Sequence, residues 1–500
     1  MSALVAEPGP SVVLAVGGSG DRTGPIITFL GAVPPHDDVA TIVVLQHREA
    51  ITHERFAEKL ADLGRAITVI SDGLPMVGGH TYLAPADVIV TMADAVFGVR
   101  AAEQVPGERG TIDTFLVSLA EHSTARSIAA LFGETGGDGT LGAASIKEAD
   151  GLVLAELSAA VTEENLATSN SPAALADAVL PADELATRVA AYLERLTAEP
   201  AQPAQLDPSA NREALASVIA VLRNKTGHDF HGYKTGTFLR RVQRRMQVLD
   251  APTLQAYEIL LQTTDSEPMN LFNDLLIGVT QFFRDKREFE VLESAVIPKL
   301  FENKTRNDHL RIWIIGCSTG EEAYSIAILL REHMSTLKEV PQVQIFASDL
   351  DGRALASARV GRYTSSVTTE VSPERLARWF VREGDTFCVV KELREMCIFS
   401  QHSIVKDAPF SRLDLVSCRN LLIYLDAEMQ SRVIPLFHFA LRPKGYLFLG
   451  NAENVSRHTA LFTPVESRSR IYQRVETGTR ILPDFPLVAS DRRPDERFSK

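Results

Sequence analysis

The sequence predicts an α/β protein with two parallel-sheet, Rossmann-like domains and a small all-helical subdomain between them. Strand-like apolar runs alternate with helical patterns over residues 11–190, and a second alternation begins near residue 310. Such alternation is typical of parallel sheets covered by helices. Between the two lies a helical pattern over 212–300, and 500 residues exceed one ordinary core.

The composition is that of a soluble globular protein, with 45% hydrophobic and 23% charged residues. No apolar run reaches the roughly 18–20 residues of a membrane span, so we expect a cytoplasmic protein with no direct membrane insertion. A net charge of −13 argues against a nucleic-acid partner. The four cysteines lack CxxC spacing, which predicts neither a disulfide nor a metal site.

The N-terminal domain is assigned to residues 1–195. Its expected strands are VVLAV, TIVVLQ, AITVI, SIAALF and LVLA. The stretch 196–211 is rich in Pro and Ala and poor in large apolar residues, so we assign it as a linker.

The C-terminal half begins with the helical subdomain, 212–300. The second α/β domain, 301–480, has expected strands at LRIWIIG, QVQIFASDL, LDLVSC and GYLFLG, and helices at GEEAYSIAILLREHM and near 426–441. Within it, 351–400 is a candidate inserted subdomain. The tail, 481–500, has the composition of a loose terminus.

One basic cluster interrupts the acidic chain. In YKTGTFLRRVQRRM, Arg240, Arg241, Arg244 and Arg245 fall on one face of a helix. This pattern fits a solvated helix face or a docking surface for an acidic partner.

The glycine turn IWIIGCSTGEEAYS joins an expected strand to an expected helix. Gly316 and Gly320 flank the turn, and Asp349 ends the next strand, where an acid commonly holds a ribose. The turn is neither GxGxxG nor a P-loop, and Glu321 and Glu322 would repel a pyrophosphate but suit a cationic amine. S-adenosylmethionine, which carries a sulfonium and an ammonium group and no phosphate, fits better; a purely structural turn is the alternative.

Six blocks over about 215–475 resemble the CheR-type chemoreceptor glutamate methyltransferases. They are DFHGYKTGTFLRRVQRRM, VTQFFRD, IWIIGCSTGEEAYSIAILL, FASDLD, DAPFSRLDLVSCRNLLIYLD and LRPKGYLFLGNAENV. The resemblance implies methyl transfer from S-adenosylmethionine to glutamates on the cytoplasmic helices of chemoreceptors.

The same resemblance implies a set of site residues. Cofactor contacts are expected at Thr280, Arg284, Gly316, Glu321 (amine), Asp349 (ribose), Ser403 and Ile404 (adenine), and the active-site wall at Arg284, Arg419 and Tyr424. The family usually has Asn-Leu where this chain has Ser403-Ile404. A backbone contact to the adenine would survive this change, whereas an amide contact would not.

Three N-terminal strands end near Ser19, His47 and Asp138. Because the carboxyl ends of parallel strands share one edge, these residues can converge as a nucleophile, a base and an orienting acid. The order Ser-His-Asp differs from that of α/β-hydrolases, and GGSGD is not GxSxG. Each residue alone also suits an ordinary turn or cap.

Residues 11–185 resemble a CheB-type methylesterase domain. The matching features are QH after the second strand, DGLPMVGGHTYLAP, IDTFLVSLAEHS and GGDGTLGAASIKEADGLVLAE. The resemblance implies hydrolysis of glutamate methyl esters with Ser19 as nucleophile, His47 as base and Asp138 as the orienting acid.

Two departures affect the esterase site. Gly20-Asp21-Arg22 stands where the family has two glycines, and ATSNSPAAL replaces a Met-Pro turn. A disturbed oxyanion site loses roughly 3–4 kcal/mol per donor. We therefore expect a retained triad with weak or no esterase activity.

Together these features predict a fused methylesterase–methyltransferase of chemosensory adaptation, with chemoreceptor helices as partner and the arginine cluster as their contact. Two alternatives remain open. One is a methyltransferase for a small molecule or nucleic acid, and the other is a sensory scaffold without turnover.

Overall fold

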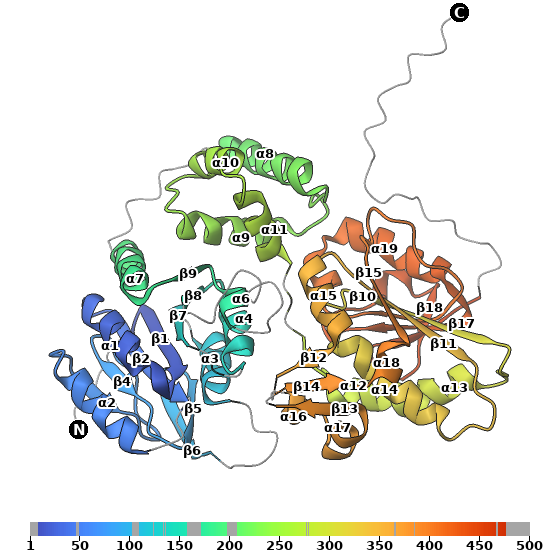
Figure 1. Cartoon of the computed structure of the whole chain (residues 1–500). Coiled ribbons are helices and arrows are strands. Elements are labelled where there is room, and N and C mark those ends of the chain that lie inside the picture. The colour runs from blue at the N-terminus through green and yellow to red at the C-terminus, as the bar shows by residue number, and fades with distance from the viewer. Residues whose placement is uncertain are drawn as a thin grey trace, which may run out of the picture.

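The computed structural model describes residues 9–46, 50–102, 110–123, 125–133, 135, 137–157, 172–197, 208–276, 278, 280–364, 367–384, 386–466 and 469–476. Figure 1 shows two α/β domains side by side, with a layer of helices over them. The predicted fold class is confirmed. No helix of the described part is long and apolar enough to cross a membrane.

The N-terminal domain is built on a parallel sheet of seven strands. Across the sheet they are β3 (Ile67–Val69), β4 (Thr81–Leu83), β2 (Val39–Gln46), β1 (Val12–Ser19), β7 (Arg126–Phe132), β8 (Leu152–Glu156) and β9 (Ala178–Leu180). Ser19 is in register with Gln46, and Gly18 with Phe132. The turns after β1, β2 and β7 therefore meet at one edge.

Both faces of this sheet are covered. The helices are α1 (Thr23–Ala32), α2 (Ala50–Ala61), α3 (Thr111–His122), α4 (Thr140–Glu148), the short α6 (Pro172–Leu175) and α7 (Ala182–Thr197). Side chains of α1, α2 and α7 share one core with the sheet. The other core contains α3, α4 and the hairpin β5 (Val88–Ala93)–β6 (Val96–Ala101), which the sequence analysis did not predict.

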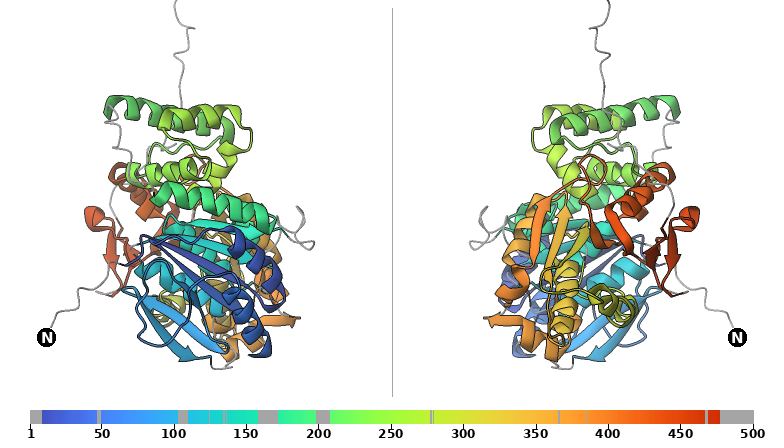
Figure 2. Two further views of the ribbon diagram at one scale, coloured as in Figure 1. Left: turned by 90° about the vertical axis from the view of Figure 1, so that its left-hand side faces the viewer. Right: turned by 90° about the vertical axis from the view of Figure 1, so that its right-hand side faces the viewer.

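Four helices form the middle subdomain. They are α8 (Pro208–Thr226), α9 (Thr235–Val248), α10 (Leu254–Thr263) and α11 (Glu267–Leu275), and they share one apolar core. The views in Figure 2 place these helices above both α/β domains. Most of the predicted linker lies outside the described residues, between the end of α7 and the start of α8.

The C-terminal domain has a second sheet of seven strands. In order they are β15 (Cys397–Gln401), β11 (Gln342–Asp349), β10 (His309–Ile315), β16 (Leu413–Cys418), β17 (Leu441–Leu449), β19 (Ile471–Arg474) and β18 (Phe462–Pro464). The first five are parallel, whereas β19 runs antiparallel to β17 and β18. The predicted tail, 481–500, lies outside the described residues.

Helices cover this sheet too. They are α12 (Lys286–Val291), a π-helix (Leu292–Val296), α13 (Ile297–Phe301), α14 (Glu321–Met334), α15 (Gly352–Val360), α16 (Val367–Glu370), α17 (Pro373–Trp379), α18 (Lys391–Arg394) and α19 (Ala427–Ala440). α14 packs in one core and α19 in the other. Within the segment 351–400, β12 (Arg362–Tyr363), β14 (Thr386–Val389) and β13 (Phe380–Glu383) form a small antiparallel sheet.

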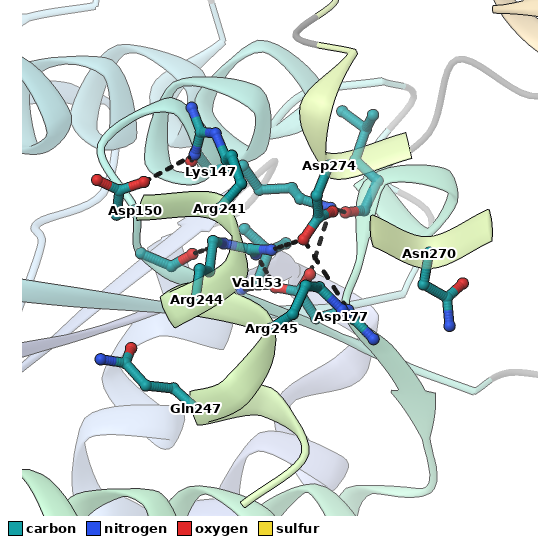
Figure 3. Close-up of polar contacts among 12 residues, drawn as sticks. Lys147, Asp150, Val153, Asp177, Arg241, Arg244, Arg245, Gln247, Asn270 and Asp274 are labelled. Atoms are coloured by element: carbon teal, nitrogen blue, oxygen red, sulfur yellow. Dashed lines mark hydrogen bonds and ion pairs between the residues drawn. The ribbon is translucent and has the colours of Figure 1, made fainter. Parts of the chain in front are cut away.

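The predicted exposed arginine stripe is wrong for three of its four members. Arg240 is exposed, but Arg241, Arg244 and Arg245 are buried. Their helix α9 packs against the N-terminal domain and α11, and buried carboxylates there satisfy the guanidinium groups because isolated buried charges are costly. Figure 3 shows this interface.

Arg244 is at the centre of the interface. It forms ion pairs with Asp177 of the N-terminal domain and Asp274 of α11, and its Nε donates to the carbonyl oxygen of Gly151 at 3.1 Å. The Lys147 Nζ contacts the same two carboxylates, at 3.2 and 3.1 Å. Burial favours a raised pKa for Asp177, but the charges of Arg244 and Lys147 outweigh it and lower this pKa to about 2. The cluster therefore joins the N-terminal domain to the helical subdomain through buried ion pairs.

Candidate functional site

The glycine turn after β10 opens at the carboxyl edge of the C-terminal sheet. Gly316 has φ +71° and Gly320 has φ +99°, a region that favours glycine. The Ser318 N–H donates to Asp349 Oδ2 at 2.8 Å, which joins the turn to the end of β11. The turn therefore fixes Asp349 beside the start of α14.

Two carboxyl groups lie at this turn: Glu321, which is buried, and Asp349, which is half-buried. Burial raises the pKa of Glu321 to about 7, although the hydroxyl of Thr319 donates to both its carboxylate oxygens, at 2.8 and 2.7 Å. Burial also raises the pKa of Asp349, opposed by N–H bonds from Asp351 and Ser318. A cationic ligand would relieve both groups, which is the charge complement of an ammonium and sulfonium compound.

Arg419 lies next to Glu322, the residue that follows Glu321 in α14. Its side chain is 0% exposed and contacts Asp285 at 2.6 Å and Glu322 at 3.3 Å. The guanidinium also lies over the ring of Phe448, at 4.6 Å. Arg419 lines the cavity as predicted, but its charge is already satisfied by protein carboxylates.

A cavity of about 120 Å³ collects the other predicted residues. Its lining includes Thr280, Arg284, Gly316, Asp349, Ser403, Ile404, Arg419 and Tyr424. The Ser403 N–H donates to Asp407 at 2.7 Å, so this backbone donor is engaged within the protein. Glu321 lies outside this lining and borders a second, adjoining cavity.

The second cavity, of about 330 Å³, lies between the domains. It shares Gly278, Thr280, Ser318 and Asp351 with the first, and its opposite wall is α4 of the N-terminal domain. α4 supplies Thr140, Leu141, Ala144, Lys147 and Glu148. The N-terminal domain thus covers one side of the candidate methyltransferase site.

The sequence analysis missed two contributors to the site. Tyr233, from the loop before α9, lines the smaller cavity, and burial raises its pKa. Glu148 comes from another domain. Both residues lie in blocks quoted for the family resemblances, but nothing in those blocks indicates that they reach this site, because packing between separate parts of the fold brings them there.

The candidate esterase site is at the carboxyl edge of the N-terminal sheet. The hydroxyl of Ser19 donates to Asp21, and the Arg22 Nε donates to Glu156 at 3.0 Å. A Cβ on Gly133, at the end of β7, would lie 2.7 Å from the Ser19 hydroxyl, so only glycine fits there. Asp21 and Arg22, the departures from the expected glycines, therefore both take part in polar contacts beside the candidate nucleophile.

Asp138 is buried beside the start of α3. It accepts backbone N–H bonds from Ile112 at 3.2 Å and Asp113 at 2.8 Å. Burial raises its pKa to about 6, although these bonds lower it. His47 lies outside the described residues, so the triad stays a prediction.

The fold and the acidic cavity define the class of protein: an S-adenosylmethionine-binding α/β domain joined to a second α/β domain. Three family models match the chain. They are "CheB methylesterase" over 14–189, "CheR methyltransferase, all-alpha domain" over 213–276 and "CheR methyltransferase, SAM binding domain" over 278–471.

Curated relatives point the same way. A putative methyltransferase, Cher3 of Pseudomonas putida, is 32% identical over 267 residues, which cover 51% of this chain and 95% of that protein. Chemotaxis protein methyltransferase 1 of Pseudomonas aeruginosa is 38% identical over 179 residues, covering 35% and 65%. The chain belongs to the family of CheR methyltransferases and carries a CheB methylesterase domain in addition.

Two further similarities include the N-terminal half. A 104.1 kDa protein of Rhodobacter capsulatus is 30% identical over 442 residues, which cover 84% of this chain; the chain spans 46% of that relative's length. The crystal structure of the Thermotoga maritima CheB methylesterase catalytic domain is similar at 22% identity and a TM-score of 0.31, covering 37% of this chain and 98% of that one.

Proposed function

We propose that this chain transfers the methyl group of S-adenosylmethionine to glutamate side chains on the cytoplasmic helices of chemoreceptors. The observation that carries the proposal is the placement of two carboxyl groups, Glu321 and Asp349, at one glycine turn, with Arg284 lining the same cavity as Asp349. Glu321 suits the cationic amine of the cofactor, Asp349 suits its ribose, and Arg284 suits an anionic acceptor.

The chemistry asks little of the protein. A glutamate with a pKa near 4.3 is ionised at pH 7, so no strong base is needed. The bound cofactor supplies an electrophilic methyl group. The protein's role is to align the acceptor carboxylate and exclude water. In this proposal Arg284 steers the carboxylate, Thr280 and Tyr424 bound the space around it, and Ser403 and Ile404 border the adenine.

A labelled-methyl assay tests the proposal. Receptor cytoplasmic fragments, small-molecule acceptors and nucleic acid are offered in parallel, with Arg284→Ala as the inactive variant. Arg306→Ala, at an exposed position before β10, is the matched control. Base-labile label on receptor fragments supports the proposal. Label on another acceptor class, or cofactor binding without transfer to any acceptor, contradicts it.

We further propose that the N-terminal domain is a glutamate methylesterase of low activity. Ser19, at the end of β1 and in register with the strand that precedes His47, is the proposed nucleophile. The contact between its hydroxyl and Asp21 supports low activity, because a carboxylate near the nucleophile opposes an oxyanion. Methanol release from methylated receptor fragments, compared with Ser19→Ala, tests this part.

A further inference from the structure

Glu148 is a carboxyl group that the proposed mechanism does not use. It is the last residue of α4 in the N-terminal domain, yet it lines the interdomain cavity together with Thr280 and Arg241. The residue is exposed to solvent, although neighbouring protein atoms partly desolvate its carboxyl group. It is therefore positioned to meet a ligand that occupies the cavity.

The helix end that carries Glu148 is held firmly. Arg241 Nη1 donates to the carbonyl oxygen of Lys147 at 2.6 Å, and Nη2 to that of Glu148 at 3.3 Å. The same guanidinium contacts Asp150 at 2.9 Å. A cation at the C-terminus of a helix is favourable in its own right. These bonds, and the ion pairs around Arg244, set the position of Glu148 relative to the helical subdomain.

The charges that act on Glu148 belong to the acceptor side of the site. Burial raises the pKa of Glu148, and the charges of Arg284 and then of Arg241 oppose the rise. Conversely, burial raises the pKa of Tyr424 to about 12, with Glu148 as the leading charged contributor. An anionic side chain near Arg284 and Tyr424 is what the proposed reaction requires of an acceptor.

A receptor helix cannot enter the interdomain cavity while the domains are packed as they are in this structure. A helix with its side chains is about 10–12 Å across, whereas the cavity holds about 330 Å³ and is walled by α4. A single side chain supplied by α4 itself does fit, because it already lines the cavity.

We propose that Glu148 is an internal methyl acceptor of this chain, taking the place of a receptor glutamate at the methyltransferase site. The inference rests on the proposed methyltransferase function. A carboxylate oxygen of Glu148 forms a bond to the methyl carbon while the bond from that carbon to the sulfonium sulfur breaks. The products are the methyl ester and neutral S-adenosylhomocysteine, with no proton transferred.

The first test is mass spectrometry of the full chain after incubation with S-adenosylmethionine. The expected result is a base-labile methyl ester on the peptide that contains Glu148, formed at a rate constant independent of protein concentration. Glu148→Gln removes it, and Glu121→Gln, an exposed glutamate on α3, does not.

The second test is cofactor affinity, which needs no turnover. A carboxylate facing the sulfonium favours S-adenosylmethionine over neutral S-adenosylhomocysteine. The Glu148→Gln change should therefore reduce this preference by about tenfold, while Glu148→Asp keeps most of it. An unchanged preference overturns the proposed placement.

Receptor fragments are included in the first test to separate the two proposals. Methylated receptor with unmodified Glu148 overturns the inference and leaves the proposed function standing. An ester on Glu148 with no receptor methylation supports the inference and contradicts the receptor as substrate. No ester anywhere despite cofactor binding overturns both.

Discussion

Arg419 contacts the backbone of Arg284: the Nη2 of Arg419 donates a hydrogen bond to the carbonyl oxygen of Arg284 at 2.9 Å. The same nitrogen binds Asp285, whose backbone has φ +63°. Such a conformation is uncommon outside glycine and persists where surrounding contacts hold it. Arg419 therefore acts as a positioning residue for the loop that carries Arg284.

The first prediction concerns this positioning. Arg419→Lys keeps the charge but loses the planar fork that reaches Asp285, Glu322 and the Arg284 carbonyl. We expect methyl transfer to fall about 10- to 100-fold, since small misplacements of an aligning group have effects of this size. Cofactor affinity should change little. The measurement is kcat together with calorimetric binding of S-adenosylhomocysteine.

Arg442→Lys is the matched control. Its guanidinium contacts Asp414 at 3.3 Å at the opposite end of β17, and we expect near-normal turnover. A loss of cofactor affinity in Arg419→Lys that equals the loss of kcat would show that Arg419 holds the cofactor directly.

The second prediction concerns pH. Because the pKa of Glu321 is raised to about 7 in the ligand-free chain, the carboxyl is protonated below that pH and cannot attract an ammonium group. Affinity for S-adenosylmethionine should therefore rise with pH up to about 7, by about tenfold per unit, and level off above it. Calorimetry at pH 7 should also detect protons released on binding.

Glu321→Gln should remove this pH dependence, while Glu339→Gln, which pairs at the surface with Arg306, should keep it. The pH dependence of the free energy of unfolding has the opposite sign to that of cofactor affinity. A folded-state pKa above the unfolded value means that stability is lost as pH rises from about 4 to about 7. The Gln variant should accordingly melt higher than wild type at pH 8 without ligand, and a lower melting temperature would contradict the assignment.

The third prediction compares two arginines one helical turn apart. Arg244→Ala leaves Asp177 and Asp274 partly unpaired in a buried interface, which costs about 3–5 kcal/mol. Arg240→Ala, at an exposed position on the same helix, should change stability by no more than about 0.5 kcal/mol. Urea unfolding followed by fluorescence measures both. Similar effects for the two variants would argue against a stabilising interface.

The fourth prediction concerns the esterase site. Asp21→Gly restores a glycine expected from the CheB resemblance and frees the Ser19 hydroxyl from its carboxylate partner. Methanol release from methylated receptor fragments should increase at least about tenfold, because one oxyanion donor is worth up to 3–4 kcal/mol. Ser19→Ala in the Asp21→Gly background should abolish the gain. A gain that survives this second change would place the nucleophile elsewhere.

The sequence predicted the two sheets well because their central strands are continuous apolar runs. The expected strands at LRIWIIG and QVQIFASDL correspond to β10 and β11, and the expected helix that starts at the glycine turn is α14. The internal strand β4 and the edge strand β9 were missed because each is only three residues long. Their pairing is decided by the neighbouring strand rather than by local pattern.

The cofactor side of the site could also be predicted from the sequence, because Asp349 is the last residue of β11 and Glu321 begins the helix after β10. The acceptor side was not. The helical spacing of Arg240, Arg241, Arg244 and Arg245 correctly predicted one face, but periodicity does not reveal whether that face meets water or another domain. In this chain the second domain covers it, and Glu148 enters the site by the same packing.

The packing of the N-terminal domain against the segment around β12 has a consequence for the two proposed activities. Gly137, next to Asp138, lies so close to Thr364 beside β12 that a Cβ there would be 2.2 Å from the threonine methyl group. A methyltransferase and a methylesterase that act at the same time on one receptor glutamate would consume cofactor in a futile cycle. Under the proposed functions, a receptor helix must separate these packed surfaces before it reaches either site, so methyl addition and methyl removal become alternative outcomes of one opening.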